Sequence, residues 1–339
     1  MELTKKNLNK NIIHLALPVA LENVLHMAVF IVDIIMIGRL GTTAVAAVGL
    51  AGALNFIISM VFSALNTGTS ALVARSFGAK KKSEAQKIAG QSLLLSIILG
   101  LITSPFIFYF ASDILILMSA EKGVVSLGSI YLKIVLSFLI PRLIILTGTA
   151  IFRGAGDTRT PMVITLITNC VNILFNWFLI YGIWFFPRME VAGAAWATAI
   201  AYITGAVLIF YKLLSKKSIL TICLKSIVDI NKSIIQRILR ISLPATLDAF
   251  LTQAGYLFFI KIVTMLGTVS LAAHQIAVRI EAMSFMPGYA LAIASATLVG
   301  QSLGAKEIDL ARLSMKRNCI IALMIMGFFA ILFGTMFDK

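Results

Sequence analysis

The 339-residue chain is 60% hydrophobic and only 13% charged, with a mean hydropathy of +0.99. An ordinary soluble domain is about 45–50% apolar and about 25% charged, so the composition excludes that class, and it also excludes disorder, which requires low hydrophobicity. A net charge of +15 often indicates a nucleic-acid partner, but so apolar a chain fits that class poorly. The sequence therefore predicts a polytopic membrane protein.

Apolar runs of spanning length occur along the whole chain. They cover residues 12–38, 47–74, 89–111, 126–151, 162–184, 192–213, 241–265, 271–299 and 318–336. These runs far exceed the roughly 10 residues of a barrel strand and lack its alternation of apolar and polar side chains. Nine transmembrane helices are therefore predicted, since a helix of about 20 residues crosses a bilayer with its own backbone hydrogen bonds satisfied.

The distribution of Lys and Arg predicts a cytoplasmic N-terminus. With that orientation most of the 29 basic residues fall in cytoplasmic segments. These segments are 1–11, 75–88, 152–161, 214–240 and 300–317. We attribute the net charge to this topology and to contact with anionic lipid, and expect a multi-pass protein of the plasma membrane.

An internal repeat divides the chain. At a displacement of 226 residues, segments 11–80 and 237–306 share about 22 identities in about 70 ungapped positions. Among them, Leu17-Pro18 aligns with Leu243-Pro244. The predicted organisation is an N-lobe of six helices (1–213), a cytoplasmic linker (214–240) and a partial C-lobe of three helices (241–339). Halves with six spans each enter the membrane in the same direction, as in many transporters. We therefore expect three further spans to be missing.

Polar residues in the spans indicate where ions act. Acids in hydrocarbon are costly and are commonly functional, and four lie in spans: Glu22, Asp33, Asp248 and Glu281. Asp33 has no basic residue within a helical turn, so it either binds a cation or proton, or joins helices as a hydrogen-bonded acid.

A second group of polar residues lies in the fifth and sixth spans. Asn172 and Asn176 share one helix face, and Thr198 on the next span can complete a cluster. Amide oxygens suit a monovalent cation, but amides also join helices by hydrogen bonds.

The second half offers a weaker set of candidates. A possible polar site comprises Asp248, Gln253, Tyr256 and Glu281, although ion pairs with Lys261 or Arg279 are an alternative for its acids. No ATP-binding lysine motif, nucleophile elbow or metalloprotease motif occurs, and the three cysteines form no zinc pattern. The sequence predicts neither an enzyme nor a cofactor, and no metal beyond a coupling Na⁺.

The segment 152–162, FRGAGDTRTPM, resembles the RGxGDT signature of the MATE (multidrug and toxic compound extrusion) transporters. The stretches LPVALENVL, AAHQIAVRIEAMSFMPG and TLVGQSLGAK also resemble that family, so the resemblance covers essentially the whole chain. It implies an all-α protein of two six-helix lobes that exchanges small organic, often cationic, compounds for H⁺ or Na⁺. The signature residues are Arg153, Gly154, Gly156, Asp157 and Thr158.

The resemblance also implies roles for individual residues. Asp33 matches the family's first-span acid, Asn172 its fifth-span Asn and Thr198 its sixth-span Thr, while Asn176 stands where some members carry a second Asp. We also expect a monomer in the bilayer, with no nucleic-acid partner. Three alternatives stay open: a lipid-linked oligosaccharide flippase of the same superfamily, an inactive fragment, and a membrane-embedded enzyme.

Overall fold

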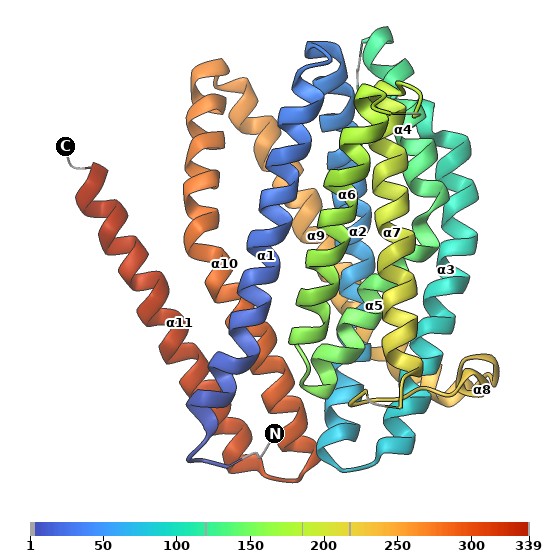
Figure 1. Cartoon of the computed structure of the whole chain (residues 1–339). Coiled ribbons are helices and arrows are strands. Elements are labelled where there is room, and N and C mark those ends of the chain that lie inside the picture. The colour runs from blue at the N-terminus through green and yellow to red at the C-terminus, as the bar shows by residue number, and fades with distance from the viewer. Residues whose placement is uncertain (1–3, 119–120, 185, 217, 338–339) are drawn as a thin grey trace.

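The computed structural model describes residues 4–118, 121–184, 186–216 and 218–337; for some residues of α8, α10 and α11 only the backbone is described. All regular structure in these residues is helical (Figure 1). The helices are α1 (Leu8–Gly38), α2 (Thr42–Gly78), α3 (Lys82–Leu117), α4 (Lys122–Ser137), α5 (Leu139–Ala155), α6 (Arg159–Tyr181), α7 (Glu190–Leu214), α8 (Leu224–Val228), α9 (Lys232–Met265), α10 (Thr268–Gly304) and α11 (Ile308–Phe337).

Most of these helices are long and apolar enough to cross a membrane. Within the described residues, seven single helices meet both criteria: α1, α2, α3, α6, α7, α9 and α11. The bent pair α4 and α5 adds an eighth candidate. The prediction of an all-helical, multi-pass membrane protein is therefore confirmed. The expected run 271–299 coincides with α10, which is not among these candidates, so the division into six plus three spans stays a prediction.

The expected helix at 126–151 is two helices rather than one. α4 ends at Ser137, α5 begins at Leu139, and the two axes differ by 56°. Pro141 explains the break, because it has no N–H to donate to the carbonyl of Ser137, and its ring would collide with that carbonyl in a continuous helix. In the first turn of a new helix the missing N–H costs nothing.

The internal repeat extends to the ends of the helices. α10 has the bounds of α2 displaced by the 226 residues of the sequence repeat, and α11 begins where the same displacement places the start of α3. Gly41 and Gly267, before these helices, have φ angles of 106° and 98°, and Lys80 and Lys306, after them, have φ angles of 58° and 64°. The two segments therefore fold alike residue by residue.

The two repeats cross closely where α2 and α10 end. A Cβ atom on Gly78 would overlap the backbone of Gln301, and one on Gly304 would overlap the backbone of Arg75. The contact is reciprocal, because Gln301 is the repeat partner of Arg75. Glycine is required at both positions for the backbones to approach this closely.

The predicted linker 214–240 contains one short helix, α8, and α9 begins inside it at Lys232. Gln91 of α3 holds this segment: its amide nitrogen donates to the carbonyls of Ser226 and Asp229, at 3.0 and 2.9 Å, and its oxygen accepts from the backbone N–H of Asn231 at 2.9 Å. Figure 1 shows α8 lying at the lower end of the bundle, at an angle to the long helices. The linker is therefore packed against α3.

Candidate functional site

A chain of hydrogen bonds joins α1, α6 and α7 through the residues that the sequence singles out. The Asn176 amide nitrogen donates to an Asp33 carboxylate oxygen at 2.6 Å and to the Asn172 amide oxygen at 3.0 Å. The Asn172 amide nitrogen lies 3.4 Å from the Thr198 hydroxyl, which donates to the carbonyl of Ala194 at 3.0 Å. The structure thus brings all four candidate residues of the first half together.

The Asp33 cluster, defined as Asp33, Asn172, Asn176 and Thr198, has an unbalanced charge. Asp33 makes no ion pair with any described residue, and Asn172 and Asn176 are 7% and 1% exposed. The Asn176 amide oxygen is buried without a hydrogen-bond donor among the described residues. A carboxylate beside an unsatisfied oxygen has the chemistry to accept a cation or a proton, because either would neutralise a costly charge.

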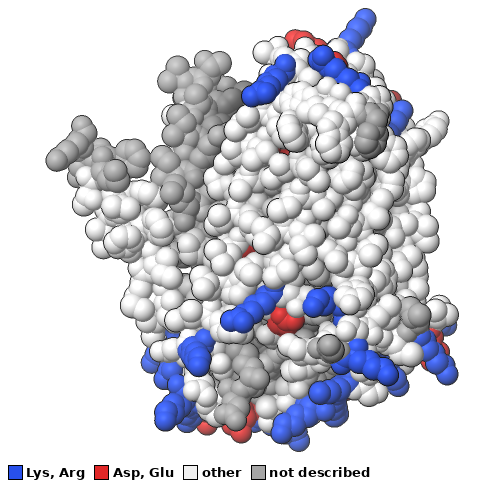
Figure 2. Space-filling model, in the orientation of Figure 1, with Lys and Arg blue, Asp and Glu red and all other residues white. Residues whose placement is uncertain are grey.

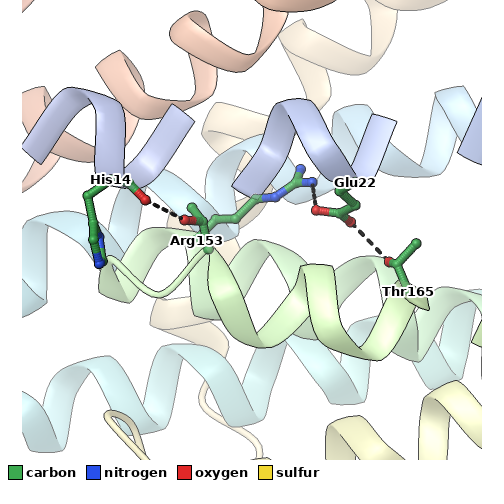
Figure 3. Close-up of polar contacts among 5 residues, drawn as sticks. His14, Glu22, Arg153 and Thr165 are labelled. Carbon is green, nitrogen blue, oxygen red and sulfur yellow. Dashed lines mark hydrogen bonds and ion pairs between the residues drawn. The ribbon is translucent and has the colours of Figure 1, made fainter. Parts of the chain in front are cut away.

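A buried ion pair joins α1 to α5 and α6 nearer the N-terminus of α1. The Arg153 guanidinium donates to Glu22 at 2.8 Å, and the Thr165 hydroxyl donates to the other carboxylate oxygen at 3.3 Å (Figure 3). The Glu22 side chain is only 5% exposed and that of Arg153 18%. Unlike Asp33, Glu22 is therefore matched by a cation and by a hydroxyl.

The signature segment also satisfies a carbonyl that a proline leaves free. Pro18, inside α1, has no N–H for the carbonyl of His14, four residues earlier. The hydroxyl of Thr158 lies 3.5 Å from that carbonyl. Asp157 accepts from the N–H and the hydroxyl of Thr160, at 2.9 and 2.6 Å, and so caps the first turn of α6.

The same segment contacts the second repeat. The Thr297 hydroxyl of α10 donates to the carbonyl of Arg153 at 3.0 Å, and the Gln301 amide nitrogen donates to the carbonyl of Gly154 at 3.0 Å. The turn at Gly156, with φ 88°, ends α5 and lies against Gln301. The signature residues therefore join both repeats around α1.

The polar candidates of the second half are not brought together. Asp248, Tyr256 and Glu281 are exposed, Gln253 is partly exposed, and none of the four makes a hydrogen bond or ion pair within the described part of the chain. A role for them stays a prediction. No group of three or more His, Cys, Asp or Glu side chains that could hold a metal ion occurs among the described residues.

Sequence reasoning missed two features of this region. It assigned Arg153 to a loop, whereas the residue lies in the last turn of α5 and pairs with Glu22. It also left Glu22 without a partner, because the two residues are 131 positions apart and no spacing rule connects them. The sequence did offer one signal for this ion pair: an acid in a span, Glu22, and a basic residue in the signature segment, Arg153.

The architecture defines an all-helical, multi-pass membrane protein with a polar cluster between spans. The MatE family model matches residues 18–178 and 244–338. The chain therefore belongs to the MATE family, whose members are membrane transporters rather than enzymes. The match includes Asp33, Asn172 and Asn176 but not Thr198 on α7, and it resumes at Pro244, the repeat partner of Pro18.

Curated relatives and solved structures agree with this assignment. The chain is 33% identical over 304 residues to a probable multidrug resistance protein NorM of Thermotoga maritima, covering 88% of this chain and 65% of that protein. It is 28% identical to a probable multidrug resistance protein YoeA of Bacillus subtilis, covering 86% and 64%. The chain thus spans about 65% of the length of these relatives.

Two solved structures share the fold. One is described as the outward-facing conformation of a multidrug resistance MATE family transporter of the MOP superfamily; it is 27% identical, with a TM-score of 0.85, and the match covers 96% of this chain and 73% of that one. A MOP superfamily transporter from Pyrococcus furiosus gives the same identity, TM-score and coverage.

Proposed function

We propose that the chain acts in secondary active efflux of small organic, often cationic, compounds in exchange for H⁺ or Na⁺. The observation that carries this proposal is Asp33, an unpaired carboxylate in a membrane span, hydrogen-bonded to Asn176 on another helix at 2.6 Å. Family membership and the multidrug resistance descriptions of the relatives support the substrate class.

In the proposed mechanism, the Asp33 cluster binds the coupling ion. Binding neutralises the carboxylate, which weakens its attraction for the Asn176 amide and lets α1 repack against α6. Substrate between the lobes is then released outward, and the lobes return by alternating access. The ion drives this cycle only if its affinity for the cluster differs between the two conformations.

The proposed setting is the plasma membrane, with the N-terminus cytoplasmic and the chain monomeric. Figure 2 supports this orientation, because many of the Lys and Arg residues on the visible face gather at the lower end of the molecule, where the α2–α3 turn also lies. A flippase would need cations facing its cavity. The sequence offers three candidates, Arg142, Lys261 and Arg279, of which Arg142 stacks over the ring of Tyr202 at 5.1 Å.

The test compares Asp33→Asn with the unaltered chain in liposomes, using uptake of a fluorescent organic cation driven by a Na⁺ or proton gradient. We expect the variant to lose gradient-driven transport. Asp113→Asn, which removes an exposed acid at the end of α3, is the matched control and should transport normally.

Ion binding by the purified chain, measured calorimetrically, separates the site from transport. Binding that disappears with Asp33→Asn supports the cluster as the ion site. Unchanged ion-driven transport in the variant would overturn the proposal, and competition by a lipid-linked oligosaccharide but not by organic cations would favour the flippase.

A further inference from the structure

A basic cavity lies outside the Asp33 cluster, between the α2–α3 turn and the start of α9. Its volume is about 610 Å³. It is lined by Lys80, Lys81, Lys82, Ser83, Glu84, Lys87, Asn231, Ile234 and Arg237. We call it the turn cavity. It lies at the end of the bundle where α2 ends and α3 begins, which is cytoplasmic in the proposed orientation.

The charge of the turn cavity is not balanced by its own residues. Five of its lining side chains are cationic and one, Glu84, is acidic. Glu84 pairs with Arg237 at 2.9 Å, and none of the four lysines makes an ion pair with a described residue. The four lysines are exposed to solvent. The cavity therefore offers four uncompensated positive charges to an anion.

The turn itself does not require three of these four lysines. The repeat partner of the turn has the same left-handed residue, Lys306, and the same closing hydrogen bond, since the N–H of Lys81 donates to Ser76 and that of Glu307 to Ser302, both at 2.9 Å. Yet Lys81 is replaced there by Glu307, Lys82 by Ile308 and Lys87 by Leu313. The same turn is thus built with only one of the four lysines retained.

The walls of the turn cavity are held in place on both sides. The Glu84–Arg237 pair ties α3 to α9, and the Asn231 side chain caps α9 by accepting from the N–H of Ile234 at 3.1 Å. The start of α3 has no side-chain cap, so its first N–H groups add to the positive field of the lysines. Anion binding here requires little ordering of the backbone.

We propose that the turn cavity binds the phosphate group of an anionic phospholipid. A volume of about 610 Å³ is within the usual range for a small-ligand site, and basic pockets beside spans suit lipid phosphates. The lipid source follows from the neighbouring surface. Beyond Arg237, α9 exposes Ile241 and Leu251 near the same helix face, on which acyl chains can lie while the headgroup meets the lysines. Inorganic phosphate would gain nothing from that apolar face.

The test compares Lys80→Ala/Lys82→Ala/Lys87→Ala with Lys6→Ala/Arg312→Ala/Lys316→Ala in the 339-residue chain. Both remove three exposed cations, but the second set lies outside the cavity lining. Native mass spectrometry counts phosphatidylglycerol retained after extraction from nanodiscs of phosphatidylcholine with phosphatidylglycerol. We expect the cavity variant to lower the association constant about 100-fold, because each cation beside an anionic headgroup contributes a factor of about five. The control variant should stay within about five-fold of the unaltered chain.

A second arm distinguishes the lipid from a free phosphate. Pyrophosphate is titrated into the detergent-solubilised chain, and binding is followed by the thermal shift. We expect phosphatidylglycerol to bind at least ten-fold more tightly than pyrophosphate. Equal loss of lipid in the two triple variants would overturn the proposal, because it would show a diffuse charge effect. Tight pyrophosphate binding without retained phosphatidylglycerol would also overturn it, in favour of a soluble anion.

Discussion

Two acids on α1 illustrate, at the residue scale, how partners determine what a buried charge can do. Glu22 has Arg153 at 2.8 Å and Thr165 at 3.3 Å, whereas the one hydrogen-bond partner of Asp33 among the described residues is the amide of Asn176. A carboxylate paired with a cation is already neutralised and has little affinity for a further cation. A carboxylate hydrogen-bonded to a neutral amide keeps its negative charge and still attracts one. The structural acid and the candidate ion-binding acid are therefore distinguished by their neighbours.

The Glu22–Arg153 pair should be strongly coupled. Arg153→Ala leaves Glu22 buried without a cation, and we expect it to lower the free energy of unfolding by about 3–5 kcal/mol. The double variant Glu22→Leu/Arg153→Met should lose much less, because it leaves no uncompensated charge. Denaturation of the chain in detergent micelles measures both. Equal losses in the single and double variants would contradict this account.

Asn176 should affect ion use more than folding. Asn176→Ala removes the 2.6 Å hydrogen bond that stabilises the ionised Asp33 carboxylate, and hydrogen bonds to charged groups are worth about 1.5–3 kcal/mol, so we expect the proton affinity of the cluster to rise 10- to 100-fold. Calorimetric ion binding measures the effect. Asn169→Ala is the control, because Asn169 donates to the backbone carbonyl of Leu25, at 2.8 Å, rather than to a residue of the cluster. Unchanged ion binding by Asn176→Ala would show that Asn176 only joins helices by hydrogen bonds and takes no part in ion binding.

At the scale of helices, the crossing of α2 and α10 holds one end of the two repeats together. Gly78 and Gly304 permit contact between the helix backbones, and Gln301 reaches across to the signature segment. α1 packs into the same region: Leu8, Ile12 and Leu15 form one buried cluster with Leu291 and Leu298 of α10. This end can open only if α10 leaves several partners at once.

A methyl group at the crossing should force the repeats apart. We expect Gly78→Ala to lengthen the distance between spin labels at residues 82 and 307, measured by double electron–electron resonance, because the new Cβ would overlap the backbone of Gln301. Gly52→Ala, also in α2, is the control, since a Cβ there meets nothing within 4 Å and should leave the distance unchanged. An unchanged distance in Gly78→Ala would show that the crossing does not hold the repeats.

The positions of the long helices were predictable from the sequence, whereas the residues at which they end or break were less so. Hydropathy located the helices, but α2 and α3 extend beyond the apolar runs because polar and basic residues continue each helix outside the lipid. The break before Pro141 was missed, since apolar composition continues across it. The Asp33 cluster was predictable because its residues are polar in apolar surroundings. The Glu22–Arg153 pair depends on tertiary packing that no local pattern encodes.

At the scale of the whole molecule, the repeat and the distribution of charge fix which ends of the helices lie together. The start of α1, the α2–α3 turn and the α10–α11 turn share one end of the bundle (Figure 1). The α1–α2 turn and the start of α4 must then lie at the other end, because each intervening helix is long enough to cross the membrane.

This arrangement predicts the sidedness of labelling. We expect single cysteines at residues 6 and 82 to react with a membrane-impermeant maleimide only in inside-out vesicles, and one at residue 122 only in intact cells. The three native cysteines, which are free and exposed, must first be replaced. Reaction of residues 6 and 82 in intact cells would contradict the proposed cytoplasmic N-terminus and indicate the opposite orientation.

The partners of α1 have a consequence for how the chain is made. α1 is synthesised first, but Arg153 follows Glu22 by 131 residues and Asn176 follows Asp33 by 143. At roughly 10 residues per second, these partners emerge more than ten seconds later. Until then α1 holds two unmatched acids, each costing about 3 kcal/mol at the centre of a bilayer. We expect the first helix to remain beside the insertion machinery and to enter lipid only when α5 and α6 have arrived, so that the earliest segment synthesised is among the last to settle.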